Sequence, residues 1–187
     1  EKLYRKAIEL DPKFANAHVG LGNVVLYDRK DYDSAVEMYR KEIELDSNYA
    51  MAHYNLGKLL KDVRKDYNGA EKLFRKAIEL EPSLAQAYNG LGVVLHMRKD
   101  YNGAEKHYRK AIELDSKYAM AHYNFGILLK TVRNNYDDAE QHIRKAIELD
   151  PSDALAHYNL GEMLQTVRKK YNEAEQHYRE AIELNEK

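Results

Sequence analysis

Residues 52–82 read AHYNLGKLLKDVRKDYNGAEKLFRKAIELEP, and this stretch decides the fold because the rest of the chain repeats it. Its last part, FRKAIELEP from Phe74, has counterparts that begin at Tyr4, Tyr39, Tyr108, Ile143 and Tyr178, in steps of 34 or 35 residues. Its first part, AHYNLG from Ala52, has counterparts that begin at Ala17, Ala87, Ala121 and Ala156. Self-similarity at a fixed period of this length is the sequence signature of a repeat architecture.

Each repeat holds two segments whose apolar residues recur at the spacing of an α-helix. In residues 52–82 the first segment carries Leu56, Leu59 and Leu60, and the second carries Ala70, Phe74 and Ala77. Three second segments stop before Pro12, Pro82 or Pro151, because the residue before a proline is disfavoured in the α region. In two other units Ser47 and Ser116 take that place, where we expect them to be N-caps of the next helix.

The repeats organise residues 1–187 as a single array. Residues 1–12 form the second helix of a truncated repeat, followed by repeats at 13–47, 48–82, 83–116, 117–151 and 152–187. Since one helix pair cannot bury its own apolar face, neighbouring pairs must stack around a shared core. This predicts an all-α fold of stacked antiparallel helix pairs, with about eleven helices. Neither end carries a polar closing helix, although solenoids normally need capping repeats, so we also consider association of copies through these uncapped ends.

Composition narrows the classes of function that the chain can have. The chain has 30 basic and 31 acidic side chains, a net charge of −1 and no cysteine. A balanced charge argues against binding of nucleic acid or of an anionic membrane, which rests on a basic surface. The lack of cysteine excludes disulfides, thiolate metal sites and cysteine nucleophiles. With no apolar stretch of membrane-spanning length and no leader segment, we expect a cytoplasmic or nuclear location.

These units resemble the tetratricopeptide repeat (TPR), which places a large residue, Leu-Gly, an apolar residue, Ala, an aromatic and Pro at set distances. In residues 52–82 the matching residues are His53, Leu56, Gly57, Leu60, Ala70, Phe74 and Pro82. The resemblance implies a right-handed superhelical α-solenoid. Two departures concern its twist: four of the five full units carry one residue inserted at the inner turn, and the frequent glycine of that turn is missing. Pentatricopeptide RNA readers share the 35-residue period, but their positively charged arrays differ from this neutral chain.

In the TPR family the first helix of each pair lines the concave face, so the resemblance implies which residues contact a ligand. The position before Leu-Gly or Phe-Gly holds Asn55, Asn124 and Asn159, whose amides can donate to and accept from a peptide backbone. The repeats of O-linked N-acetylglucosamine transferase carry a similar His-x-Asn-Leu segment that holds extended peptide. Further groove positions are Met51, Tyr54, Lys58, Gln86, Asn89, Val93, Met120, Tyr123, Ile127, Leu155, Tyr158 and Glu162. Two alternatives stay open: the asparagines bond only neighbouring turns, and the tyrosines pack on one another.

Histidines and arginines form further ladders. One histidine set is His18, His53, His122 and His157, and the other is His107, His142 and His177. Members of one set are a repeat apart, too far to share an ion through bonds of ~2.1 Å, so we expect packing or surface histidines and no metal. Arginines recur at the inner turns as Arg29, Arg64, Arg98, Arg133 and Arg168. There they either complement the helix dipole or form a basic rim for acidic partners. On the second helices we expect (i, i+4) pairs such as Arg75 with Glu79.

The chain shows no phosphate-binding glycine loop and no nucleophile with a base, so we expect neither an enzyme nor a cofactor. The leading hypothesis is a non-catalytic scaffold that binds an extended or helical peptide segment of a partner protein in its concave groove. The alternatives are a structural module that self-associates through its uncapped ends, and the targeting arm of a larger transferase. Chaperone C-termini are not expected ligands, because the basic pair that holds their carboxylate is not assembled in either register.

Overall fold

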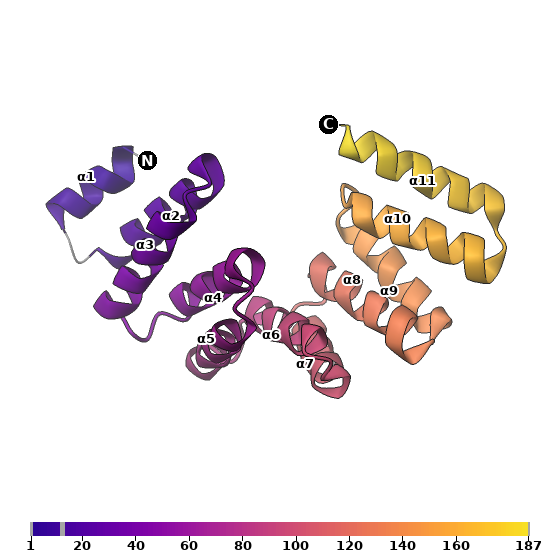
Figure 1. Ribbon diagram of the computed structural model, residues 1–187, viewed down its shortest axis with the longest axis horizontal. Helices are drawn as coiled ribbons and strands as arrows, with labels where there is room; N and C mark the ends of the chain where they lie inside the picture. Colours follow the sequence, from indigo (N-terminus) through magenta and orange to yellow (C-terminus); the bar gives the residue numbers. More distant parts are fainter. Residues whose placement is uncertain (1, 12–13, 187) are drawn as a thin grey trace. The chain divides into compact units, whose positions relative to one another are not determined.

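The computed structural model describes residues 2–11 and 14–186, and within them all regular structure is helical (Figure 1). Eleven α-helices are seen there, which confirms the predicted all-α fold. They are α1 (Lys2–Leu10), α2 (Ala15–Arg29), α3 (Tyr32–Leu45), α4 (Ala50–Leu59), α5 (Tyr67–Leu80), α6 (Ala85–Met97), α7 (Tyr101–Leu114), α8 (Ala119–Leu128), α9 (Tyr136–Leu149), α10 (Ala154–Met163) and α11 (Tyr171–Asn185). Three π-helical turns follow α4, α8 and α10: η1 (Leu60–Arg64), η2 (Leu129–Arg133) and η3 (Leu164–Arg168).

Contacts divide the chain into two compact units, residues 1–94 and 95–187. In the first unit, α2 packs on α3 and α4 on α5, while α1 contacts α2 and α3 contacts α4. In the second unit, α8 packs on α9 and α10 on α11, while α7 contacts α8 and α9 contacts α10 (Figure 1). Each full pair therefore has a first and a second helix, and within each unit successive pairs touch through neighbouring helices.

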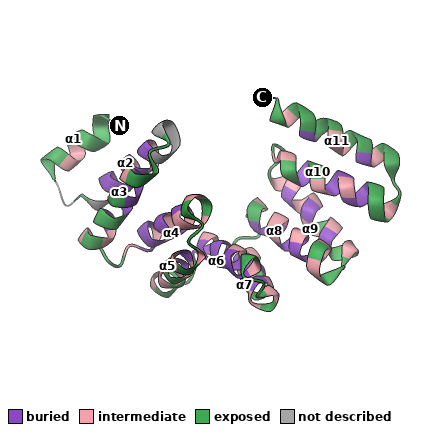
Figure 2. Ribbon diagram, viewed as in Figure 1, coloured by how far each residue is buried: buried purple, intermediate pink, exposed green. Residues whose placement is uncertain are grey.

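Small residues on the first helices allow this close packing. Ala52 is fully buried, and a Cβ added to Gly57 would lie 3.1 Å from the ring of Phe74, which is itself fully buried. In the second unit a Cβ on Gly126 would lie 2.8 Å from Ile143. Burial of each large apolar side chain contributes roughly 1.5–3 kcal/mol to stability. Figure 2 shows these buried residues in purple along the paired helices, whereas α1 carries none.

Four of the second helices, α3, α5, α7 and α9, begin at side-chain caps. Asp66 accepts a hydrogen bond from the backbone N–H of Gly69 at 2.9 Å, and Asp31, Asp100 and Asn135 do the same at their own helices. Such caps contribute about 1 kcal/mol each. The prediction that Ser47 and Ser116 are N-caps is wrong. Helices α4 and α8 start two residues later than a capping serine requires, after Tyr49 and Tyr118, with no side-chain cap.

In three of the four 35-residue units the inserted residue lies at the end of the first helix. There η1, η2 and η3 absorb it as a π-turn, which corrects the expectation of an insertion at the inner turn for these units. In the 35-residue unit that contains η1, the N–H of Asp66 reaches back six residues to the carbonyl of Leu60 at 3.0 Å. In the 34-residue unit the N–H of Asp100 reaches back only five residues, to Leu95 at 2.9 Å. A widened turn satisfies the same backbone groups with one more residue.

The missing turn glycine leaves lysine or asparagine in a left-handed conformation. Lys30, Lys65, Lys99, Asn134 and Lys169 follow the first helices with φ between 53° and 65°. The backbone N–H of Lys65 donates to the carbonyl of Leu60, closing the π-turn. Left-handed backbone costs a side-chain-bearing L-residue roughly 1–2 kcal/mol, so these turns carry strain that glycine would relieve.

Candidate functional site

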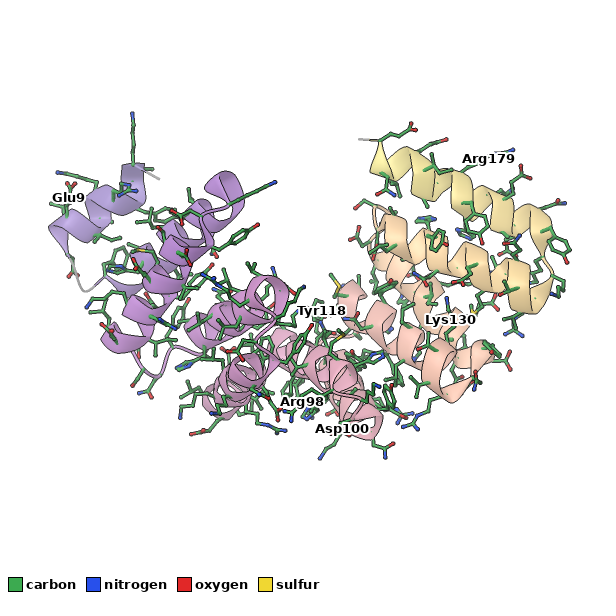
Figure 3. All side chains as sticks on the ribbon, viewed as in Figure 1. Glu9, Arg98, Asp100, Tyr118, Lys130 and Arg179 are labelled. Carbon is green, nitrogen blue, oxygen red and sulfur yellow. The ribbon has the colours of Figure 1, made fainter. Side chains whose placement is uncertain are left out.

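Asn159, a predicted groove residue, is fully engaged inside the second unit. Its Nδ2 donates to the hydroxyl of Tyr123 at 3.1 Å and to the carbonyl of Leu155 at 2.9 Å. Its Oδ1 accepts a hydrogen bond from Nζ of Lys130 at 3.0 Å, and the same ammonium group forms an ion pair with Glu162 at 2.6 Å. Lys130 extends from η2, where Figure 3 labels it. Both amide hydrogens of Asn159 are thus used by the chain itself.

Asn55 occupies the equivalent repeat position in the first unit, but the hydrogen bonding of its amide differs from that of Asn159. Its amide makes no hydrogen bond to the residues that the structure describes, and it lines an open cavity of about 230 Å³. The cavity lies between α3 and the α4–η1 segment. It is lined by Lys30, Tyr32, Tyr39, Asn55, Lys58, Leu59, Asp62 and Val63. Tyr39 is held there by a hydrogen bond from its hydroxyl to Oδ1 of Asn23 at 2.6 Å. Two predicted groove residues, Asn55 and Lys58, therefore share one cavity.

The other predicted groove residues differ in exposure. Met51 and Tyr54 pack on the cluster around Ala77 and Leu84, and the Tyr54 ring lies 5.9 Å from the ring of Phe74. Asn89 is buried, so a ligand on the surface does not reach it.

In the second unit Met120 and Tyr158 are about half exposed, and the Tyr158 ring lies 5.7 Å from that of Tyr178. Tyr123, Asn124 and Ile127 are half-buried. The tyrosines thus divide between packing and exposure.

The two histidine ladders meet in pairs, which sequence reasoning missed. Nδ1 of His122 lies 3.0 Å from Nδ1 of His142, and Nδ1 of His157 lies 3.1 Å from Nδ1 of His177. On the outer side, Nε2 of His122 contacts the carbonyl oxygen of Ser116 at 3.2 Å. The sequence signal was present: only the last two units carry histidine at both positions.

This geometry dictates where the protons lie. A carbonyl oxygen only accepts, so Nε2 of His122 carries a hydrogen and the Nδ1 of neutral His122 is an acceptor. His142 must then donate through its own Nδ1–H. Burial, followed by neighbouring His122 and Arg109, lowers the pKa of His142. Burial, followed by His157 and Arg144, lowers the pKa of His177. His142 and His177 therefore resist protonation.

Glu42 on α3 is a buried carboxyl in an apolar position. It stands where the other second helices have alanine, as in Ala77 and Ala111, and it has no exposed surface. Neither carboxylate oxygen has a hydrogen-bond partner among the described residues. Burial, with a smaller effect from Asp46, raises the pKa of Glu42 to about 7. This residue also escaped the sequence reasoning, although the single alanine-to-glutamate change in the repeat was visible.

The arginine ladder ties neighbouring pairs together, a role that neither interpretation of the ladder foresaw. Arg133 in η2 binds Glu105 on α7 at 2.9 Å, and Arg168 in η3 binds Glu140 on α9 at 2.9 Å. Arg64 in η1 pairs likewise with Asp33 on α3. Surface ion pairs of this kind contribute about 0.2–1 kcal/mol each. The side chain of Arg29 lies outside the described residues.

The charged pairs within second helices also differ from the prediction. Arg75 pairs with Glu71, four residues before it, at 2.8 Å, whereas Glu79 pairs with Lys76 at 2.7 Å. The same arrangement recurs at Arg109. The predicted pairing of each arginine with the glutamate four residues after it is therefore wrong, because lysine three residues before that glutamate takes it.

The described residues contain neither a cluster of potential metal ligands nor a membrane-spanning helix. No group of three or more histidine, cysteine, aspartate or glutamate side chains there could hold a metal ion. None of the helices in residues 2–11 and 14–186 has both the length and the apolar character needed to cross a bilayer.

Comparison with known proteins places these features in a family. Models described as tetratricopeptide repeat or TPR repeat match residues 25–62, 85–118 and 130–187, and a Sel1 repeat model matches residues 45–82. No curated protein sequence matches the chain.

Solved structures are similar over most of the chain. YrrB, described as a TPR protein with an unusual peptide-binding site, is 27% identical, with a TM-score of 0.65 over 97% of this chain and 91% of that one. MamA is 26% identical, with a TM-score of 0.67 over 86% and 92%. The Cut9–Hcn1 structure of the APC/C is 21% identical, with a TM-score of 0.85 over 98% of this chain and 36% of that one, and shows the fold alone. The repeat pattern, the paired helices and these matches agree, and the chain belongs to the tetratricopeptide repeat family.

Proposed function

We propose that the chain is a non-catalytic interaction scaffold that binds a peptide segment of a partner protein along its first helices. The observation that carries this proposal is the unengaged amide of Asn55 beside an open cavity. An asparagine amide in that state can donate to a backbone carbonyl and accept from a backbone N–H of a ligand. The fold supports the same conclusion, and YrrB is described as having a peptide-binding site.

The proposal assigns unequal roles to the groove asparagines. Asn55 is ready to bind, whereas Asn159 must first give up hydrogen bonds to Tyr123 and Leu155. Since each such bond contributes about 0.5–1.5 kcal/mol, a ligand gains less from Asn159. Met120 and Tyr158, which are about half exposed, offer adaptable apolar contact area for the remainder of the segment.

A displayed library of random peptides tests the proposal. We expect enrichment of a sequence motif and a dissociation constant measurable by calorimetry. Asn55→Ala should weaken binding about tenfold, the cost of one or two hydrogen bonds, while Asn159→Ala should have a smaller effect. Failure to enrich any peptide, or binding that survives replacement of Asn55, Asn124 and Asn159 together, would contradict the proposal.

Self-association is a second candidate, favoured by an apolar surface on α10 and α11. Leu155 is 63% exposed and Ile182 is 58% exposed, and both line an open cavity of about 430 Å³ with Tyr158 and Tyr178. Exposed apolar surface of this kind marks interaction sites. Light scattering distinguishes this candidate: a chain that stays monomeric at high concentration does not self-associate through it.

A further inference from the structure

Lys130 in η2 reaches across to the next helix pair and binds two predicted groove residues there. Its ammonium group donates to Oδ1 of Asn159 at 3.0 Å and forms an ion pair with Glu162 at 2.6 Å. The side chain of Lys130 is 14% exposed, whereas that of Lys145, which pairs with Glu148 on α9, is 40% exposed. Lys130 is therefore withdrawn from water onto the first helix that a peptide would contact.

The two groups that hold this ammonium group are both acceptors. The amide hydrogens of Asn159 are used by Tyr123 and Leu155, at 3.1 Å and 2.9 Å, so the amide presents its oxygen to Lys130. The carboxylate of Glu162 also only accepts. An amide oxygen beside a carboxylate favours a cation that donates hydrogen bonds. The bonds made by Lys130 show that an ammonium group on a methylene stem fits this place.

Earlier repeats do not combine the same residues. Two repeats before, the counterpart of Lys130 is Lys61, but glycine and valine stand at the positions of its two partners, and Lys61 pairs with the neighbouring Asp62 instead. Three repeats before, the counterpart is Leu26, and the groove asparagine of the pair that follows, Asn55, lines an open cavity. The contact of Lys130 thus depends on an asparagine and a carboxylate supplied together by the next helix pair.

We propose that Asn159 and Glu162 form a binding site for a lysine side chain of the bound peptide, and that Lys130 occupies this site in the free chain as an intramolecular competitor. This inference rests on the proposed peptide-binding function and adds the residue that the peptide carries and a contact that restrains binding. A tethered group acts at an effective concentration of about millimolar, so a free amine below that concentration does not displace Lys130. A peptide already held along the first helices brings its own lysine to the site at a comparable effective concentration.

The first test removes the competitor. Lys130→Met keeps an apolar side chain of similar length and vacates the site, so the displayed library selected on this variant should enrich peptides that share a lysine. Such a peptide should bind Lys130→Met about tenfold more tightly than the unmodified chain, and norleucine in place of the peptide lysine should abolish the gain. Lys145→Met removes the same charge from the exposed side of α9 and should leave the affinity unchanged.

The second test asks whether the peptide and Lys130 compete for the same oxygen atoms. Asn159→Ala should alter peptide affinity little in the unmodified chain, where Lys130 holds the amide oxygen, and weaken it about tenfold in the Lys130→Met background. Glu162→Gln should show the same dependence on background. Equal effects in the two backgrounds would overturn the inference.

A measurement on the unmodified chain covers the case in which circular dichroism and thermal melting show that Lys130→Met does not fold. Saturating peptide should release Lys130 to solvent, so that the hydrogens on its Nζ, followed by NMR, exchange with water faster than in the free chain. Those of Lys145 should not change. Unaltered exchange at Lys130 with peptide bound would also overturn the inference.

The outcomes separate this inference from the function on which it rests. If no peptide binds either the unmodified chain or Lys130→Met, both fail. If peptides bind but Lys130→Met changes neither their affinity nor the enrichment of lysine, peptide binding stands and the lysine site is wrong. A gain in affinity that depends on the peptide lysine, on Asn159 and on Glu162 supports the site.

Discussion

His122 on α8 and His142 on α9 face each other with their Nδ1 atoms 3.0 Å apart. Only one proton fits between two such atoms. One added proton is accommodated at the outer Nε2 of His142, but full protonation of both rings turns two N–H groups toward each other. His157 and His177 repeat the arrangement at 3.1 Å. In each of the last two repeats a histidine contact therefore joins the first helix to the second. This contact exists only while the imidazoles are largely neutral.

Acidification should destabilise these repeats. Because burial lowers the pKa of His122, His142 and His177 below 6.5, the unfolded chain binds more protons than the folded chain. The stability they contribute is present above pH 6.5 and is lost as the pH falls below it. Charged neighbours facing these rings are Asp115 and Lys145 at His122, Arg109 and Asp138 at His142, and Arg144, Glu173 and Glu180 at His177.

The double variant His142→Leu and His177→Leu isolates the effect, because the second repeat already pairs His53 with leucine at position 73. We expect the urea midpoint of the unmodified chain to fall between pH 7.5 and pH 5.5 by more than that of the variant. If the urea midpoints of the two proteins fall by the same amount between these pH values, the histidine pairs do not take up protons on unfolding.

Glu42→Ala should stabilise the first unit, most strongly at high pH. The pKa of Glu42 is raised from 4.5 to about 7, so its contribution to stability is full below pH 4.5 and is lost as the pH rises through about 7. The penalty relieved at pH 8 is up to about 3 kcal/mol. Urea unfolding at pH 5 and pH 8 measures it, with Glu44→Ala on the exposed side of the same helix as control. A variant that is destabilised equally at both pH values would contradict the assignment.

Lys65→Gly should also stabilise the chain. Lys65 has a φ of 55°, and glycine adopts this conformation without the cost of a Cβ. Glycine also gives the unfolded chain more conformational freedom. This offsets part of the stability gained, leaving up to about 1 kcal/mol. Lys72→Gly in the middle of α5 is the control and should cost about 0.5–1 kcal/mol. Urea midpoints that shift in the same direction for both variants would exclude strain at Lys65.

Gly126→Ala should destabilise the second unit by about 1–3 kcal/mol through overpacking. The added methyl group would lie 2.8 Å from Cγ1 of Ile143 and 3.2 Å from the backbone oxygen of Ala139. Combining it with Ile143→Ala removes the first clash, so the double variant should lose less stability than the sum of the single changes. If denaturant unfolding shows that the stability losses of the two single variants simply add in the double variant, the cost of Gly126→Ala does not come from the contact with Ile143.

The arrangement of helices was predictable from sequence because it depends on periodicity. The spacing of Leu56, Phe74 and Ala77 marks which helix faces are apolar, and recurrence of that spacing predicts how pairs stack. Helix ends were less predictable. Ser47 was expected to cap α4, yet the helix starts after Tyr49, since a shift of two residues leaves the periodicity intact and moves the cap out of reach.

At the candidate site, too, the sequence determined one part and the tertiary structure another. The sequence by itself determined that the chain is an array of helix pairs and that Asn55 and Asn159 occupy equivalent positions on first helices. Only the tertiary structure decided that Lys130 engages Asn159, that an open cavity lies at Asn55, that His122 meets His142 and that Glu42 is buried without a partner. The physical reason is the distance along the sequence between the residues that interact. A helical face is set by residues three or four apart, whereas a hydrogen bond or a buried charge depends on the approach, within about 3 Å, of side chains 20 or more residues apart.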